Sequence, residues 1–273
     1  MRAQTAEPDT YKYDHVRSQT LMSDMSFRPT APRPGDRLPD FALLTTDGTR
    51  LSSETLLGAK PLLLVPGSLT CPMTKASAPM LKRLHAEFGE RVQMVLLHVR
   101  EAHPGEHREQ PHSFEEKMEH AKQLQAREAF PFPVLVDDDD GSVHRSLDEK
   151  PNSAWLADAR GIIIYRALWA GDESGLRQAL EAAVRGEKPA KPESTRRLAP
   201  MAEGIGVMQE TLREAGPRAQ RDLIKAAPPM AAMAWIADRF RPLSPRTRGY
   251  AAMGTLAALT AGAVAATVRA IRH

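Results

Sequence analysis

Residues 61–99 read PLLLVPGSLTCPMTKASAPMLKRLHAEFGERVQMVLLHV and predict the centre of a folded domain. The first seven and the last nine residues of this segment are rich in large apolar side chains, which is typical of strands buried on both faces. Between them, apolar residues recur at helical spacing from Met80 to Phe88, and Gly89 ends the pattern. A strand, a helix and a second strand in this order imply two parallel strands joined by a right-handed crossover.

The segments on either side complete a mixed sheet. Asp47-Gly48 between two short apolar runs predicts a β-hairpin ahead of residue 61. The remaining expected elements are a helix capped by Ser113 and Glu116, strands within 132–141 and 153–171, and a helix over 176–186. The predicted fold class is therefore α/β, a mixed sheet with helices on both faces, followed by a C-terminal helical appendage.

Composition divides the 273-residue chain into four parts. We expect a mobile, polar, Pro-containing N-terminal segment, a folded domain, a Pro-, Lys- and Glu-rich linker, and a helical region. Their predicted bounds are 1–33, 34–187, 188–200 and 201–273.

Charge and cysteine content exclude several classes of protein. Lys and Arg number 37 against 34 Asp and Glu, a net charge of +3, which argues against nucleic acid as a partner. Cys71 is the single cysteine, so the chain forms no intramolecular disulfide and is no Cys-rich zinc module. The first twenty residues have no apolar segment typical of a cleaved secretory peptide.

Cys71 directly follows the first buried strand and precedes Pro72, which is favoured in the first turn of a helix. Free backbone N–H groups at a helix start favour a thiolate, so we expect a reactive thiol with a lowered pKa. The alternative is a small buried apolar residue, as most free cysteines are. Ser68 and Thr70 flank the turn and either bind substrate or cap the helix.

Glu101 and His103 follow the second strand, so they should lie beside Cys71 if the two strands are neighbours. A histidine can move a proton near neutral pH, and a carboxylate two residues earlier could orient it. Five histidines fall between His98 and His120, yet none has the spacing of known metal ligands. We therefore expect neither a metal site nor a cofactor.

Two short motifs resemble a known family. GSLTCP (67–72) and REAHP (100–104) are similar to the two signature segments of the iodothyronine deiodinases, thioredoxin-fold selenoenzymes. Residues 34–185 also resemble the wider redoxin group, which includes the peroxiredoxins. The resemblance implies a thioredoxin-like fold and a thiol-based oxidoreductase.

The resemblance also assigns roles to residues. Cys71 stands at the position of the selenocysteine nucleophile, Glu101 and His103 at those of the acid–base pair, and His112 near that of a further histidine. The family's second thiol is Leu69 here, so an external thiol must regenerate Cys71, and thyroid-hormone deiodination does not follow. Pro151 resembles the cis-proline of thioredoxin folds.

Two alternatives remain beside the deiodinase-like hypothesis, whose substrate is a small-molecule electrophile. One is a one-Cys peroxiredoxin-like peroxidase, although Pro66 lies only five residues before Cys71, where that family has seven. The other is a non-catalytic, membrane-tethered binding module. A thiol that titrates near pH 6–7 favours an enzyme, whereas one that titrates at or above about 8.5 favours the module.

Residues 250–268 form an uncharged run that is long enough to span a membrane, with arginines on both sides. Because Ala and Gly predominate, the alternative is a helix packed on protein. The first interpretation predicts a cytoplasmic domain anchored to a membrane by its C-terminus.

Overall fold

The computed structural model describes residues 11–271, which contain an eight-stranded mixed sheet of order β2-β1-β5-β4-β3-β6-β7-β8. The strands are β1 (Ala42–Thr45), β2 (Arg50–Ser52), β3 (Leu62–Gly67), β4 (Gln93–His98), β5 (Val134–Val136), β6 (Ala154–Ala157), β7 (Ile163–Ala167) and β8 (Glu193–Ser194). The helices are α1 (Ser18–Ser23), α2 (Ser53–Leu56), α3 (Pro72–Phe88), α4 (Phe114–Glu128), α5 (Ser142–Ser146), α6 (Glu173–Val184), α7 (Leu198–Ala215), α8 (Pro217–Ala226), α9 (Pro228–Asp238) and α10 (Pro245–Ile271).

The central strands β3, β4 and β5 are parallel, and β6 and β1 flank them antiparallel. Gly67 at the end of β3 pairs with His98 at the end of β4. The loops that follow these two strands therefore leave the same edge of the sheet side by side, which is where parallel sheets collect their functional residues.

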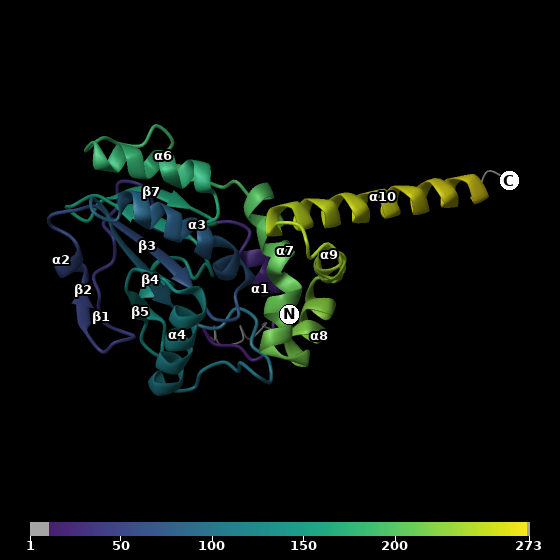
Figure 1. The fold of residues 1–273 in the computed structure, drawn as a ribbon, viewed down its shortest axis with the longest axis horizontal. Coiled ribbons are helices and arrows are strands. Elements are labelled where there is room, and N and C mark those ends of the chain that lie inside the picture. Colours follow the sequence, from purple (N-terminus) through teal and green to yellow (C-terminus); the bar gives the residue numbers. More distant parts are fainter. Residues whose placement is uncertain (1–10, 272–273) are drawn as a thin grey trace, which may run out of the picture.

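Helices cover both faces of this sheet (Figure 1). Alternate strand residues point to opposite sides, so Leu63 packs with α3, α4 and α6, whereas Leu64 packs with α2 and α5. Both faces are buried, which explains the uninterrupted apolar run of β3. The predicted α/β fold, a mixed sheet with helices on both faces and a C-terminal helical appendage, is confirmed.

The N-terminal segment differs from the prediction of a mobile lead-in over residues 1–33. Residues 1–10 lie outside the described residues, but residues 11–33 form an arm that packs on the domain, with Tyr11 and Val16 buried. The Tyr11 hydroxyl lies 2.8 Å from Nδ1 of His144, and the guanidinium of Arg100 stacks 4.7 Å from the Tyr11 ring. Polar composition suggested mobility, yet these aromatic contacts hold the arm in place.

Residues 188–200, predicted as a linker, include β8, which adds to the edge of the sheet beside β7. Arg166 of β7 fixes this short strand through a 2.8 Å hydrogen bond to Glu193. The helix α7 then begins at Leu198 and packs on α3, α8 and α9. The polar composition conceals this strand because edge strands need few apolar side chains.

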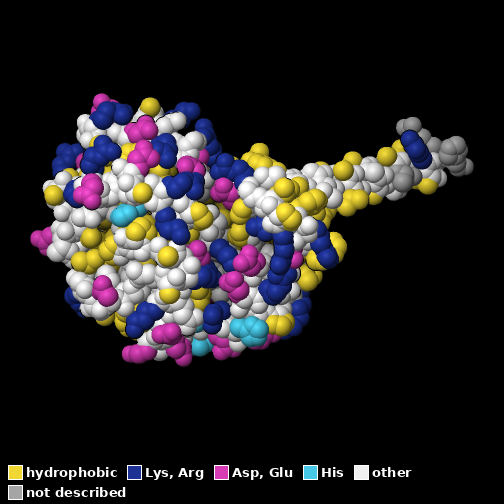
Figure 2. Space-filling view, viewed as in Figure 1, with side chains coloured by type: hydrophobic (Ala, Val, Ile, Leu, Met, Phe, Trp, Pro, Cys, Tyr) yellow, Lys and Arg dark blue, Asp and Glu magenta, His cyan; other side chains and the backbone are white. Residues whose placement is uncertain are grey.

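The last helix, α10, projects away from the rest of the molecule (Figure 1). Its start packs on α7 and α9, whereas residues from Gly254 onward are largely exposed. Figure 2 shows hydrophobic side chains along α10, in contrast to the mixed charges of the body. With a mean hydropathy of 1.6 and 6% of its apolar window buried, α10 has the length and composition of a membrane span.

Candidate active site

Cys71 lies where β3 passes into α3. Cys71 is the N-cap residue of α3, and Pro72 occupies the first turn of the helix. The backbone N–H of Cys71 donates to the Ser68 carbonyl at 3.3 Å. The helix start therefore faces the sulfur, as the sequence predicts. Pro79 does not divide α3, which is continuous over 17 residues because its apolar face packs along the sheet.

The expected lowering of the Cys71 pKa is wrong for this structure. The side chain is only 1% exposed. Burial raises the pKa of the thiol to about 11, although hydrogen bonds from Thr74 and from the Met73 backbone favour the thiolate. The sequence pattern reveals the helix start but not the segments that cover it.

Cys71 faces an apolar cavity of about 70 Å³ that opens beside α3. The domain contributes Pro72, Met73, Ala102, His103, Pro151 and Trp169, the N-terminal arm contributes Leu21, Asp24 and Met25, and α7 and α9 contribute Met201, Ile205, Met208 and Met230. The arm and the appended helices together form a cap over the cysteine. Pro151 lines this cavity, but no peptide bond within residues 11–271 is cis.

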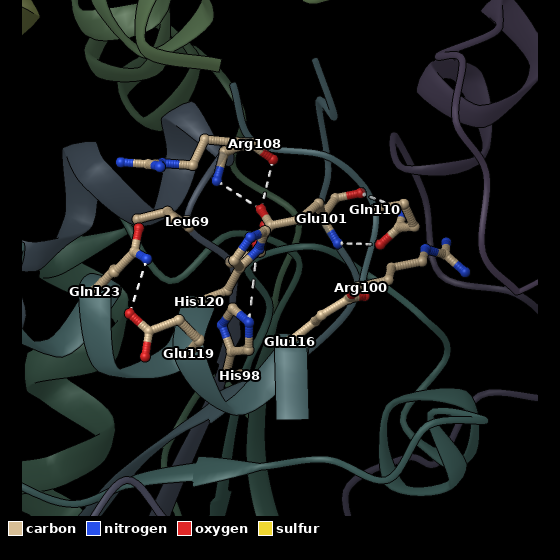
Figure 3. Close-up of polar contacts among 12 residues, drawn as sticks. Leu69, His98, Arg100, Glu101, Arg108, Gln110, Glu116, Glu119, His120 and Gln123 are labelled. Atoms are coloured by element: carbon tan, nitrogen blue, oxygen red, sulfur yellow. Dashed lines mark hydrogen bonds and ion pairs between the residues drawn. The ribbon is translucent and has the colours of Figure 1, made fainter. Parts of the chain in front are cut away.

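Glu101 is fully buried and lies among His98, Gln110 and His120 (Figure 3), and its carboxylate holds the loop that carries Cys71. Its Oε2 accepts hydrogen bonds from the backbone N–H of Thr70 at 2.7 Å and from the Thr70 hydroxyl at 2.6 Å. Its Oε1 lies 3.0 Å from Nδ1 of His120 and 3.7 Å from Nε2 of His98. The expectation that Glu101 orients His103 is therefore wrong, because Thr70 and His120 occupy both carboxylate oxygens.

The pKa of Glu101 lies well below its usual range. Burial alone would raise it, but the hydrogen bond from His120, the charges of His98 and His120, and the Thr70 hydroxyl lower it to about 2. The carboxylate therefore stays ionised at neutral pH, where it accepts hydrogen bonds but has little tendency to take up a proton.

Ser68 and Thr70 join the two loops instead of lining the cavity. The Ser68 hydroxyl accepts from the backbone N–H of Ala102 at 3.2 Å, and the Thr70 hydroxyl accepts from that of His103 at 3.0 Å. Neither residue is among those that line the cavity. Their predicted role in substrate binding is thus replaced by cross-links between the loops after β3 and β4.

His103 lies in the cavity with Cys71, as the position of the two loops predicts. Its side chain is 6% exposed, and Nδ1 is buried without a hydrogen-bond partner among the described residues. Burial lowers the pKa of His103 to about 4, against the opposing charge of Asp222. The imidazole is therefore neutral at pH 7.

His112 does not contribute to the cavity. Its side chain is exposed, with Nε2 3.9 Å from the Asp14 carboxylate, and its backbone N–H donates to Glu116 at 2.8 Å. The predicted role of His112 in substrate binding therefore gains no support from the cavity, because the chain turns into α4 with this side chain facing solvent.

Sequence reasoning missed three residues near Cys71. His120 reaches Glu101 from the first half of α4, and Gln110 accepts from the Glu101 backbone N–H at 2.8 Å while it donates to the Tyr13 carbonyl at 3.0 Å. Asp24 enters the cavity from the arm. The histidine cluster pointed to His120, but no sequence signal marked Asp24. Residues 11–271 contain no group of three or more His, Cys, Asp or Glu arranged to hold a metal ion.

Comparison with known proteins gives a family match over half of the chain. Residues 33–180 match the family described as Redoxin. No curated protein matches the sequence.

Several solved structures share part of the architecture at low identity. An uncharacterized conserved protein from Geobacillus kaustophilus is 21% identical over 59% of this chain and 88% of that chain, with a TM-score of 0.49. A protein assigned as thiol:disulfide interchange protein DsbE from Chlorobium tepidum is 21% identical over 56% and 99% of the two chains, with a TM-score of 0.46. The peroxidoxin BcpB from Mycobacterium tuberculosis is 19% identical over 57% and 97%, with a TM-score of 0.42.

Proposed function

The chain belongs to the Redoxin family, and from that premise we propose that it is a deiodinase-like thiol oxidoreductase with Cys71 as its single nucleophile. The observation that carries the proposal is that Cys71 and His103 share one covered cavity at the ends of two parallel strands. The sulfur attacks an electrophilic oxygen or halogen atom, the bond to the leaving group breaks, and the leaving group takes up the thiol proton. With a peroxide, the products are a sulfenic acid and an alcohol or water.

Regeneration requires an external thiol, because the chain has no second cysteine. The incoming thiol displaces water from the sulfenic acid to form a mixed disulfide, and a second thiol releases Cys71. The reaction needs no cofactor or metal ion. His103 offers a neutral ring nitrogen to the substrate, while Glu101 holds the Cys71 loop through Thr70.

The cavity favours a small apolar electrophile. Its lining is mostly Met, Leu, Ile, Trp and Pro, so transfer of an apolar molecule from water is favourable there. The cavity of about 70 Å³ admits only a few heavy atoms, about two water molecules by volume. A larger substrate requires the cap to move.

The one-Cys peroxidase hypothesis uses the same residues with a hydroperoxide as the electrophile. The non-catalytic module has its own supporting observation, since Cys71 is 1% exposed and burial raises its pKa to about 11. A thiol pKa of about 11 lies above about 8.5, the range in which thiol titration favours the non-catalytic module.

Mass spectrometry of Cys71 after one equivalent of cumene hydroperoxide or of an aryl iodide tests these alternatives. A deiodinase-like enzyme gains one oxygen atom from the hydroperoxide or one iodine atom from the aryl iodide, excess glutathione removes either group, and the Cys71→Ser variant gains neither. A peroxidase responds to the hydroperoxide alone, and a binding module responds to neither reagent. A Cys71→Ser variant that retains full activity would overturn the enzyme proposal.

We also propose that α10 anchors the domain to the cytoplasmic face of a membrane. Its exposed apolar surface from Gly254 onward has no partner among the described residues, and arginines stand at both ends. Carbonate extraction should leave the full-length chain with the membranes, and a chain truncated after Arg248 should become soluble. Recovery of the full-length chain in the soluble fraction would contradict the anchor.

A further inference from the structure

Asp24 is a carboxylate in the Cys71 cavity that lies outside the residues that match the Redoxin family. It is the C-cap residue of α1, in the arm that precedes the Redoxin match at residue 33. It lines the cavity together with Cys71 and His103, and no other acidic residue within residues 11–271 does so. Its side chain is half-buried, and a carboxylate at the edge of an apolar cavity is most stable when a cation or a hydrogen-bond donor pairs with it.

The cations nearest to Asp24 are engaged elsewhere. Among the described residues, the Asp24 side chain makes no hydrogen bond and no ion pair. Arg100 attracts it but pairs with Glu149 at 2.8 Å. Lys150 also attracts it, but its Nζ donates to the Ser23 carbonyl at 2.8 Å and lies 3.3 Å from Asp148.

These surroundings reverse the usual order of proton affinity between a carboxylate and an imidazole. Burial raises the pKa of Asp24 to about 7, with Arg100 and Lys150 opposing the shift and Glu149 and Asp148 adding to it. Burial lowers the pKa of His103 to about 4. Of the two groups beside the thiol, the carboxylate is the stronger base.

We propose that Asp24 is the proton-transfer group of the Cys71 cavity, which accepts the thiol proton and returns it to the leaving group. The inference rests on the proposed function and deepens it. For a hydroperoxide, Asp24 takes the proton as the S–O bond forms and the O–O bond breaks, and the departing alkoxide then takes that proton from Asp24. The products are a Cys71 sulfenic acid and an alcohol, and Asp24 returns to its ionised form.

A simple charge effect predicts the opposite result from a base. The negative charge of Asp24 raises the pKa of Cys71, so its removal alone would increase the thiolate fraction and speed the reaction. Removal of a base slows the reaction, by about 10²-fold for a positioned group. The Asp24→Asn variant therefore distinguishes the two roles by the sign of the change.

The experiment follows single-turnover oxidation of Cys71 by cumene hydroperoxide in the full-length protein, on both sides of about pH 7. We expect the wild-type rate to rise through about pH 7 and level off, and Asp24→Asn to react about 10²-fold more slowly without that step. Asp24→Glu should restore the step. Asp14→Asn changes an exposed carboxylate of the same arm and is the matched control, with an unchanged rate.

An Asp24→Asn variant that reacts as fast as the wild type, or faster, would overturn the proposal and leave the proposed function intact. A Cys71→Ser variant that consumes the peroxide at the wild-type rate would instead overturn the proposed function. Asp24→Asn should fold, because an amide removes the cost of burying a charge, and its unfolding midpoint checks this. If it does not fold, a flat pH profile of folded Asp24→Glu would also overturn the proposal.

Discussion

Substitution of Glu101 tests whether this carboxylate anchors the Cys71 loop or transfers a proton. Glu101→Ala removes the acceptor of both Thr70 hydrogen bonds and the partner of His120. Removing one partner of a buried ionic interaction lowers the free energy of unfolding by about 3–5 kcal/mol. We therefore expect a loss of about 4 kcal/mol, or about 10 °C in Tm.

Glu101→Gln should be far milder because it preserves the shape and most hydrogen bonds. The amide oxygen can accept from both Thr70 donors, and the amide nitrogen takes the place of Oε1 beside Nδ1 of His120. We expect a loss of about 1–2 kcal/mol and a single-turnover rate within several-fold of the wild type. An acid–base role predicts instead that Gln and Ala both lower the rate by about 10²-fold.

Thermal unfolding and cumene hydroperoxide oxidation, measured on both variants, separate these outcomes. A Glu101→Gln protein with a wild-type Tm and a rate lowered by about 10²-fold would refute the anchoring role. Acid titration adds a second check. Because the folded-state pKa is depressed, the contribution of Glu101 is complete above pH 4.5 and is lost as the pH falls toward 2. In the Glu101→Gln variant, the free energy of unfolding should therefore change less with pH between 4.5 and 2 than in the wild type.

Three further predictions concern neighbouring residues. Thr70→Val should lower the unfolding free energy by about 2 kcal/mol in denaturant titrations, because it leaves the buried His103 N–H unpaired. His103→Ala should slow single-turnover oxidation by no more than about 10-fold, less than Asp24→Asn, because the imidazole is the weaker base. Burial lowers the pKa of His98 to about 3, so stability should fall as the pH drops from 6.5 toward 3, and His98→Leu should reduce that fall in pH-dependent unfolding.

The sequence predicts the centre of the domain well because its signals are local. The apolar run at 61–67 and the helical spacing up to Phe88 specify β3 and α3, and the chain order implies their parallel neighbour β4. The same reasoning brings the loops of Cys71 and His103 together, since their strands end at the same edge. These inferences require only periodicity and the geometry of parallel sheets.

The environment of Cys71 was not predictable, because distant segments form it. Asp24 precedes Cys71 by 47 positions and Met208 follows it by 137, yet both line its cavity. No periodicity links such residues. The helix start alone favours a low thiol pKa, but the cap excludes water and reverses the sign of the shift. Likewise, Glu101 and His103 are two residues apart, but the Glu101 carboxylate binds Thr70 and His120, whereas the His103 side chain lines the cavity.

Close backbone contacts fix this cap on the domain and on α10. A Cβ atom at Gly204 of α7 would lie 2.4 Å from the sulfur of Met73, which lines the cavity, and one at Gly249 of α10 would lie 1.8 Å from the carbonyl oxygen of Ala202. The contact at Gly249 is with backbone, so α10 can approach α7 this closely only where glycine stands, whereas at Gly204 the flexible Met73 side chain can move aside. The helix that covers Cys71 is thus also the helix that holds the base of α10. If α10 enters a bilayer, α7 therefore keeps the apolar cavity close to the lipid surface, where apolar substrates concentrate.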